Sequence, residues 1–256
     1  MSEQELIYKV ENRVAYITIN REAKRNSISP GVTRLCHQYL NDAESDENVR
    51  VICITGAGEK AFCSGADLGG AVSEDGLDAF QDYADLLKRI AGYPKPTMAR
   101  VNGYCLAGGT GFMLSCDIVI AAEHAKFGTP EVNVGLFPMM IGALIFRNVL
   151  RKKAMEMCLL GEKLTARQAL DMGLVTRVVP SDQLDNEVND VLKNLAGKSH
   201  IGMKIGKEAF YQMADKPFEE AVDYLCSQLG AIASTEDAKE GIMAFLEKRE
   251  PNFVGK

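Results

Sequence analysis

Two short glycine-containing segments could bring backbone amides to one point. The first is Gly65-Ala66-Asp67, and the second is Ala107-Gly108, at the start of an apolar stretch with helical spacing. Small residues let the main chain approach a ligand closely, and the first N–H groups of a helix lack intrahelical acceptors. Two such donors facing one oxygen form an oxyanion hole, which stabilises charge developing on a carbonyl. Tight packing would explain the same glycines, so the residues alone leave both interpretations open.

One carboxylate lies in an apolar segment where it could move protons beside such a carbonyl. Glu131 follows Pro130 and is flanked by Val132, Val134 and Leu136. In an apolar pocket, desolvation raises the pKa of a glutamate above its ordinary value of about 4.3, toward the range useful for proton transfer at neutral pH. A surface glutamate after a turn is the alternative for a Pro-Glu pair.

Other glycine and metal motifs do not fit the sequence. Residues 56–61 have the dinucleotide spacing G-x-G-x-x-A, but residues 62–65 interrupt the helix that a pyrophosphate site requires. The chain contains no G-x-x-x-x-G-K-[ST] and no G-x-S-x-G motif, which excludes a P-loop and a hydrolase elbow at Ser64. The histidines at 37, 124 and 200 stand alone, so we expect no metal site and no cofactor.

The elements that must position these groups follow from hydrophobic spacing. Ser29 and Pro30 are predicted as the N-cap and first residue of a helix. Strands are predicted at 5–11, 13–20, 49–55, 94–103, 117–123 and 174–180, and further helices at 77–91, 107–116, 140–149, 165–173 and beyond 182. This repeated β-β-α pattern with a helical end predicts an α/β core over residues 1–198 and a C-terminal helical region over residues 199–256.

Composition narrows the class of protein. A formal net charge of -6 argues against nucleic acid as a partner, because phosphate binding needs positive surface. No apolar run is long enough to span a bilayer, and the polar start MSEQELIYKVE lacks the features of a targeting peptide. The seven cysteines include no C-x-x-C pair and lie mostly in apolar surroundings, which predicts reduced, buried thiols. We therefore expect a cytoplasmic protein with no membrane partner.

Four ordered motifs resemble the enoyl-CoA hydratase/isomerase family, also called the crotonase superfamily. They are AFCSGADL (61–68), VNGYCLAGGTGFMLSCDIVIA (101–121), FGTPEVNVGLFP (127–138) and LTARQALDMGLVTRVVP (164–180). The likeness extends from RVAYITINR to FLEKREPNF, nearly the whole chain. It implies a spiral of repeated β-β-α units, an acyl-CoA thioester as substrate, and C-terminal helices that build a homotrimer or a dimer of trimers. Coenzyme A would be part of the substrate rather than a cofactor.

The resemblance assigns roles to particular residues. It places the two oxyanion amides at Ala66 and Gly108 and the acid/base at Glu131. Lys24 and Arg25 would approach the CoA phosphates and adenine, which suits their charge, although a solvated surface loop is the alternative. The other positions expected to line the substrate path are Ser64, Gly65, Asp67, Leu68, Gly109, Gly111 and Met139. Asp67 is also expected to stabilise its loop.

The departures from the family pattern concern the reaction. Family hydratases hold a water between two glutamates, and the position of the first is Gly111 in this chain. Some relatives carry an acidic group eight residues after the second glutamate, where this chain has Met139. One carboxylate can still carry a proton between two carbons while the oxyanion hole stabilises a dienolate. The residues thus favour Δ3-to-Δ2 enoyl-CoA isomerisation, and the overall likeness favours hydration, in fatty-acid or related acyl-CoA metabolism. Gly111 is also expected to leave room for a bulkier acyl group.

Two further functions remain open at this point. The missing glutamate at Gly111 would suit a non-catalytic acyl-CoA-binding subunit, and the same scaffold could support a decarboxylase or a C–C hydrolase. Near the C-terminus, segments such as AVDYLCSQLGAIA carry more apolar surface than a lone appendage can bury. This surface independently predicts self-association.

Overall fold

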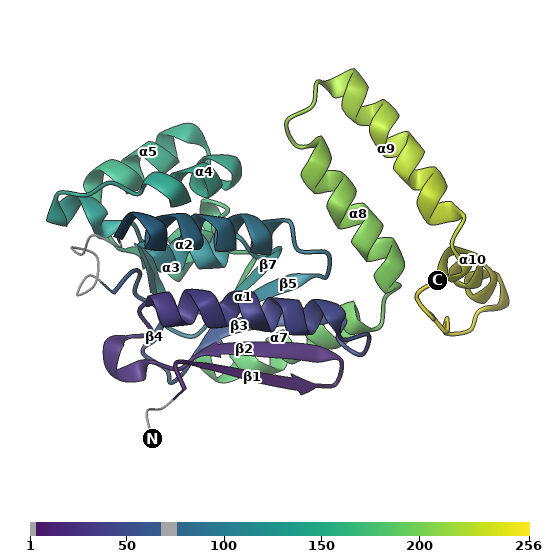
Figure 1. Ribbon diagram of the computed structural model, residues 1–256, viewed down its shortest axis with the longest axis horizontal. Coiled ribbons are helices and arrows are strands. Elements are labelled where there is room, and N and C mark those ends of the chain that lie inside the picture. Colours follow the sequence, from purple (N-terminus) through teal and green to yellow (C-terminus); the bar gives the residue numbers. More distant parts are fainter. Residues whose placement is uncertain (1–3, 68–75) are drawn as a thin grey trace.

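A six-stranded, mostly parallel sheet forms the centre of the molecule in the computed structural model, which describes residues 4–67 and 76–256 (Figure 1). Its order is β1-β2-β3-β5-β7-β10, and only β1 runs antiparallel to its neighbour. The strands are β1 (Leu6–Glu11), β2 (Val14–Ile19), β3 (Val51–Gly56), β5 (Thr97–Val101), β7 (Ile118–Ala122) and β10 (Arg177–Val179). Each coincides with a segment predicted from the sequence, where apolar residues indicated buried strands.

A second, four-stranded sheet has the order β4-β6-β8-β9 within the described residues. Its strands are β4 (Ala61–Cys63), β6 (Tyr104–Leu106), β8 (Lys126–Gly128) and β9 (Leu164–Thr165). The chain passes from the large sheet to the small one three times, from β3 to β4, β5 to β6 and β7 to β8, and a helical segment follows each pair. These strands were not predicted, because two or three residues are too few to show a periodicity.

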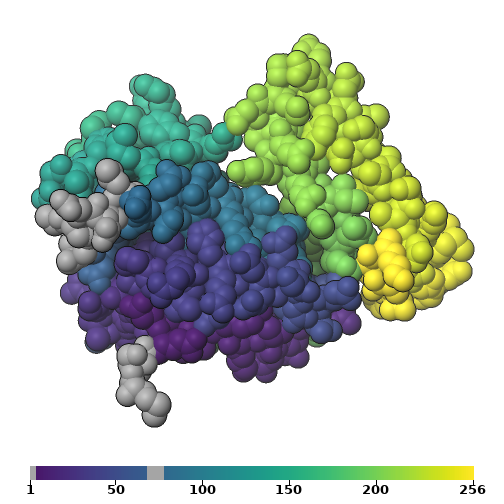
Figure 2. Space-filling view, viewed as in Figure 1, coloured from purple at the N-terminus to yellow at the C-terminus, as the bar shows by residue number. Residues whose placement is uncertain are grey.

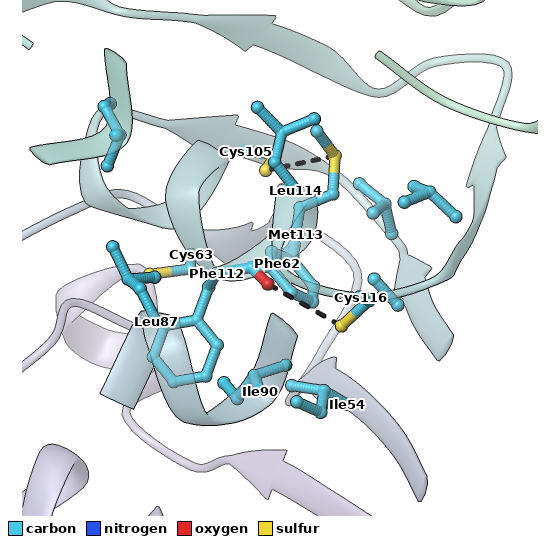
Figure 3. Packing of buried hydrophobic residues seen from close by; sticks show 14 of the residues in the cluster. Ile54, Phe62, Cys63, Leu87, Ile90, Cys105, Phe112, Met113, Leu114 and Cys116 are labelled. Atoms are coloured by element: carbon cyan, nitrogen blue, oxygen red, sulfur yellow. Dashed lines mark hydrogen bonds between the residues drawn. The ribbon is translucent and has the colours of Figure 1, made fainter. Parts of the chain in front are cut away.

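The helices cover both faces of the large sheet. They are α1 (Pro30–Ser45), α2 (Gly76–Ala91), α3 (Gly108–Leu114), α4 (Met139–Asn148), α5 (Arg151–Leu160), α6 (Ala166–Asp171) and α7 (Leu184–Ala196). Ser29 caps α1 as predicted, since its Oγ accepts a hydrogen bond from the Val32 N–H at 3.1 Å. On one face, Phe112 of α3 packs with Leu87 and Ile90 of α2 in the main core (Figure 3). On the other face, α7 packs against β3 and β7.

The last three helices form a C-terminal arm, residues 200–256, which stands away from the core (Figures 1 and 2). It comprises α8 (His200–Met213), α9 (Phe218–Ala233) and α10 (Glu236–Glu247). Lys207 of α8 reaches Asp117 on the core, and Arg147 of α4 forms a 2.8 Å ion pair with Asp215. Within the described part of the chain, no residue of α9 is buried. The division predicted after residue 198 falls between α7 and α8, and its meaning as a domain boundary stays a prediction.

The cysteines behave as their sequence contexts indicated. All seven are free, and six of them are buried, while Cys226 in α9 is exposed. Burial raises the pKa of the Cys36, Cys53 and Cys63 thiols to about 12, which keeps them protonated. Among the described residues, no helix is both long enough and apolar enough to cross a membrane.

Candidate active site

The first predicted amide lies in a segment that pairs with the loop after β2. The Ile28 N–H donates to the Gly65 carbonyl, and the Asp67 N–H donates to the Ile28 carbonyl, both at 2.8 Å. In such a parallel bridge, the residue between the two hydrogen-bonded positions turns its own N–H and C=O to the opposite side. The Ala66 amide therefore points away from Ile28.

The second predicted amide begins α3. Its N-cap, Ala107, has φ 51° and ψ −128°, a combination that non-glycine residues rarely adopt. The Gly108 N–H is the first of the helix and so has no intrahelical acceptor. A Cβ built on Gly108 would lie 3.6 Å from the Ala66 nitrogen, so the two amides are neighbours. Across residues 4–67 and 76–256, neither amide donates to a protein acceptor, which leaves both free to bind an oxygen.

Two glycines make this approach possible. Gly65 has φ 98°, and a Cβ on it would lie 2.7 Å from the Ala107 Cβ. A Cβ on Gly109 would overlap the carbonyl of Cys63 in β4. Close packing at Gly65 and Gly109 and the approach of the Ala66 and Gly108 amides therefore occur together. The side of Gly109 where a Cβ would stand is occupied by Cys63 of β4. Contact of Gly109 with substrate stays a prediction.

The predicted acid/base is carried by a segment anchored to the same turn. The Gly128 carbonyl at the end of β8 accepts the Ala107 N–H at 2.9 Å and the Thr110 hydroxyl at 3.1 Å. A short 3-10 helix, η2 (Pro130–Val134), follows at once and contains Glu131. Glu131 therefore lies three residues after Gly128, whose carbonyl is hydrogen-bonded to residues at the start of α3.

The environment of Glu131 is unusual for a carboxylate. Its Oε2 atom is buried and has no hydrogen-bond partner in the described part of the chain. Burial raises the pKa of this carboxyl, against a smaller lowering effect from its own backbone N–H. Buried polar atoms in folded proteins nearly always have partners, so each exception calls for an explanation. One explanation for this exception is that the oxygen binds a ligand or takes up a proton.

The space beside Gly111 differs from the expectation. A Cβ built on Gly111 would overlap Cγ2 of Ile141 in α4 and would lie 3.2 Å from the hydroxyl of Tyr83 in α2. Ile141 is 3% exposed and Tyr83 is 8% exposed. The prediction that Gly111 leaves room for a bulkier acyl group is therefore wrong, because these two side chains fill the space. A carboxylate side chain at position 111 would not fit either.

The predicted CoA-binding positions lie beside the first amide. The Ser64 N–H donates to the Arg25 carbonyl at 3.1 Å, and Lys24 Nζ lies 3.1 Å from Oδ2 of Asp67. The side chains of Lys24 and Arg25 are exposed, and the ion pair fits the stabilising role expected of Asp67. Contacts of this loop with CoA stay predictions.

Two other predicted positions are less closely tied to this site. Met139 is the first residue of α4 and is 74% exposed. Leu68 lies outside the described residues. The roles of both in substrate binding stay predictions.

Sequence reasoning missed Arg21, whose side chain joins the loop after β2 to the segment that contains Asp67. Its side chain is 10% exposed and lies 2.8 Å from Asp67, 2.9 Å from Glu5 and 2.6 Å from the Ser27 carbonyl. A charged residue directly after a buried strand was the available signal. Tyr83 was also missed, since an aromatic residue on a helix face is ordinary core composition.

Comparisons with known proteins identify the family of the chain. The chain matches the family described as enoyl-CoA hydratase/isomerase over residues 9–256. It is 35% identical to the 2,3-dehydroadipyl-CoA hydratase of Escherichia coli (strain K12), over 98% of this chain and 99% of that one. The (E)-benzylidenesuccinyl-CoA hydratase of Thauera aromatica is 34% identical, over 96% and 98% of the two chains.

Solved structures confirm the predicted spiral fold. An enoyl-CoA hydratase from Bacillus anthracis superimposes with a TM-score of 0.95 at 30% identity, covering 99% of this chain and all of that one. The human enoyl Coenzyme A hydratase domain-containing protein 3 gives a TM-score of 0.93 at the same identity. The chain therefore belongs to the enoyl-CoA hydratase/isomerase family, the crotonase superfamily.

Proposed function

We propose that this protein is a Δ3-to-Δ2 enoyl-CoA isomerase of fatty-acid or related acyl-CoA metabolism, in which one carboxylate moves a proton beside a thioester. The observation that carries the proposal is the buried Oε2 of Glu131, which has no hydrogen-bond partner among residues 4–67 and 76–256. It is supported by the paired free amides of Ala66 and Gly108 and by Ile141, which fills the place of a second carboxylate at Gly111.

The proposed reaction has two proton transfers and one intermediate. The thioester oxygen accepts hydrogen bonds from the Ala66 and Gly108 amides while ionised Glu131 removes a proton from C2 of a 3-enoyl-CoA. The C2–H electron pair becomes a C1=C2 bond, and negative charge moves to the thioester oxygen as a dienolate forms. When the carbonyl reforms, the double bond shifts to C2=C3 and C4 takes the proton back from Glu131. Every atom and electron is conserved, so the step requires no cofactor besides the CoA ester.

Burial gives Glu131 a basicity suited to this shuttle. A raised pKa strengthens the carboxylate as a base toward C2. The oxyanion amides lower the barrier most when charge is on the oxygen, which is when the dienolate forms.

Hydration of 2-enoyl-CoA is the second candidate, because both curated relatives described above are named hydratases. Water would have to add across C2=C3 with Glu131 both orienting it and supplying the proton for C2. With Ile141 beside Gly111, the water would lack the second carboxylate that the family pattern provides. We therefore expect hydration to be the slower reaction.

Product identification tests the proposal directly. Purified protein is incubated with 3-enoyl- and 2-enoyl-CoA esters of equal chain length, and the products are separated and identified by mass and by enoyl-thioester absorbance. We expect 3-enoyl-CoA to become 2-enoyl-CoA, and Glu131→Gln to bind the ester without converting it.

The other outcomes would each contradict the isomerase proposal. A 3-hydroxyacyl-CoA formed faster than the isomer would indicate a hydratase. Carbon dioxide from malonyl-type esters, or a free acid from cyclic-ketone esters, would indicate a decarboxylase or a C–C hydrolase. Binding of every ester with conversion of none would indicate a non-catalytic acyl-CoA-binding subunit.

The assembly and location are also part of the proposal. A homotrimer or dimer of trimers built through the C-terminal arm is supported by its exposed apolar side chains, Phe210, Phe218, Leu229, Ile242, Phe245 and Leu246. Apolar patches of this kind characterise interaction surfaces. A cytoplasmic location is supported by the six buried, unpaired thiols.

Light scattering at micromolar concentration tests the assembly. We expect a trimeric or hexameric mass for the native protein and a smaller mass for Phe245→Glu, which places a charge on the arm's apolar surface. Ile7→Glu changes a side chain that is exposed on the edge strand β1 of the core and should leave the mass unchanged. A monomeric native protein would contradict the proposal.

A further inference from the structure

Tyr83 makes a specific contact with the oxyanion segment that the proposed reaction has not used. It lies on α2 with 8% of its surface exposed, and its hydroxyl donates a hydrogen bond to the Gly108 carbonyl. Its ring lies 5.9 Å from that of Phe112 in α3. The side chain therefore joins α2 to the first turn of α3 through one polar and one aromatic contact.

Gly108 requires support of this kind. It has no side chain to restrict its φ and ψ angles, and it follows Ala107, whose backbone is in a sparsely populated conformation. On the N-terminal side, the Ala107 N–H is held by the Gly128 carbonyl at 2.9 Å. On the other side, the Tyr83 hydroxyl holds the Gly108 carbonyl. The Ala107 carbonyl, in the same peptide unit as the Gly108 N–H, accepts the Thr110 N–H at 2.9 Å. Of these three contacts, only that of Tyr83 comes from a side chain.

The protonation state of Tyr83 suits a fixed donor. Burial raises the pKa of its hydroxyl well above the usual range, and the nearby thiols of Cys63, Cys105 and Cys36 act in the same direction. The hydroxyl therefore stays protonated near neutral pH. A protonated hydroxyl donates to the carbonyl without adding charge near the dienolate.

We propose that Tyr83 is a positioning residue, whose hydroxyl fixes the Gly108 carbonyl, restricts rotation about the Gly108 backbone bonds and so keeps the Gly108 N–H facing the thioester oxygen. The inference rests on the proposed oxyanion chemistry and adds to it the residue that orients one of the two donors. Tyr83 does not touch the reacting atoms in this account. It acts through Gly108, so its loss should weaken transition-state binding more than substrate binding.

Tyr93 provides a matched control. Its hydroxyl also donates to a backbone carbonyl, that of Leu40 at 2.7 Å, and its side chain is 1% exposed. It follows α2 and contacts α1 rather than the oxyanion segment. Tyr83→Phe and Tyr93→Phe therefore remove the same atom from the same kind of bond, and only one of these bonds holds Gly108.

The first readout is the kinetics of 3-enoyl-CoA conversion by the native protein and both variants. For Tyr83→Phe we expect kcat to fall on the order of tenfold with KM nearly unchanged, less than the 10²–10³ that loss of a whole oxyanion donor produces. The acid limb of the pH profile, set by Glu131, should not move. Tyr93→Phe should keep the native kcat and KM. Equal kcat values for the two variants would overturn the proposal.

A second readout does not depend on turnover and separates this inference from the proposed function. Acetoacetyl-CoA binds as an enolate in an oxyanion hole, while butyryl-CoA cannot, so their relative affinities report on the hole. We expect Tyr83→Phe to weaken acetoacetyl-CoA binding about tenfold and butyryl-CoA binding little. A native protein that binds acetoacetyl-CoA no better than butyryl-CoA would overturn the proposed function. An unchanged affinity ratio in Tyr83→Phe, with an active native protein, would overturn only the role of Tyr83.

Discussion

Two carboxylates, the partly buried Glu131 in η2 and the buried Asp237 in the C-terminal arm, differ in the partners that the chain gives them. Asp237 is 1% exposed and accepts hydrogen bonds from the Ser199 hydroxyl at 2.7 Å and from the Val254 and Gly255 amides at 2.8 and 2.9 Å. Burial acts to raise its pKa, but these hydrogen bonds outweigh burial, and the net pKa lies below the ordinary value. Asp237 stays charged and ties the end of the chain to the start of α8.

Glu131 shows the opposite outcome. Its Oε2 has no partner among the described residues, so burial dominates and the pKa is raised. Burial alone therefore does not decide what a carboxylate does in this protein. Hydrogen-bond partners make Asp237 a structural anion, and the lack of a partner for Oε2 among the described residues leaves Glu131 able to exchange a proton. Changes at either carboxylate, or in the oxyanion segments, should therefore affect activity and stability differently.

Glu131→Gln should separate activity from stability. We expect no detectable conversion of 3-enoyl-CoA, a loss of at least the 10²–10⁴-fold that a general acid–base group contributes. The folded pKa of Glu131 is raised above its unfolded value, so ionisation above that pKa lowers the stability of the native protein. The variant should therefore unfold at higher denaturant concentration near neutral pH, and the difference should vanish below about pH 4.3. A variant less stable than the native protein at neutral pH would break the contrast.

Gly65→Ala should damage the oxyanion hole without touching Glu131. The added Cβ would lie 2.7 Å from Ala107, in a backbone conformation that L side chains rarely adopt. We expect kcat to fall by about 10²–10³-fold as the two amides move apart. Gly206→Ala is the matched control, because its Cβ would meet nothing within 4 Å. A normal rate in Gly65→Ala would show that the amides need not lie side by side.

The pH dependence of kcat/KM should report the raised pKa of Glu131. The carboxylate must be ionised to remove a proton from C2, so the rate falls on acidification as it takes up a proton. We expect the midpoint of this fall above the ordinary glutamate value of about 4.3. Initial rates in a constant-ionic-strength buffer series measure it. A midpoint at or below 4.3 would mean that Glu131 is solvated like a surface group.

Asp237→Asn should change stability and spare the chemistry. Loss of charge-assisted hydrogen bonds should lower the free energy of unfolding by about 1.5–3 kcal/mol at neutral pH. Because the folded pKa of Asp237 is lowered, this stability is present above the unfolded value of about 3.9 and is lost as pH falls through the folded pKa. Denaturation of both proteins across this range measures it, with kcat per folded site unchanged. An equally stable variant would remove Asp237 as the structural counterpart of Glu131.

The contrast also shows where sequence reasoning succeeded. The long strands and the capped start of α1 could be predicted from the sequence. The glycines of the two oxyanion segments were also visible. These features depend on residues close together in the sequence.

Features that depend on distant residues could not be predicted in this way. The partners of Asp237 lie at 199, 254 and 255, so its segment resembled the solvated face of an amphipathic helix. Ile141, which fills the space at Gly111, is thirty positions away and lies on another helix. Tyr83 reaches Gly108 only after α2 has packed on α3. Chain folding, rather than local pattern, brings these pairs together.

The most direct test of the one-carboxylate account follows a hydrogen from C2 to C4. A 3-enoyl-CoA carrying deuterium at C2 is converted in ordinary water under single-turnover conditions, and the 2-enoyl-CoA product is analysed by mass spectrometry and NMR. If Glu131 carries the hydrogen, part of the deuterium should appear at C4, and Glu131→Gln should form no product. A product with only solvent hydrogen at C4, or an active Glu131→Gln variant, would contradict the account.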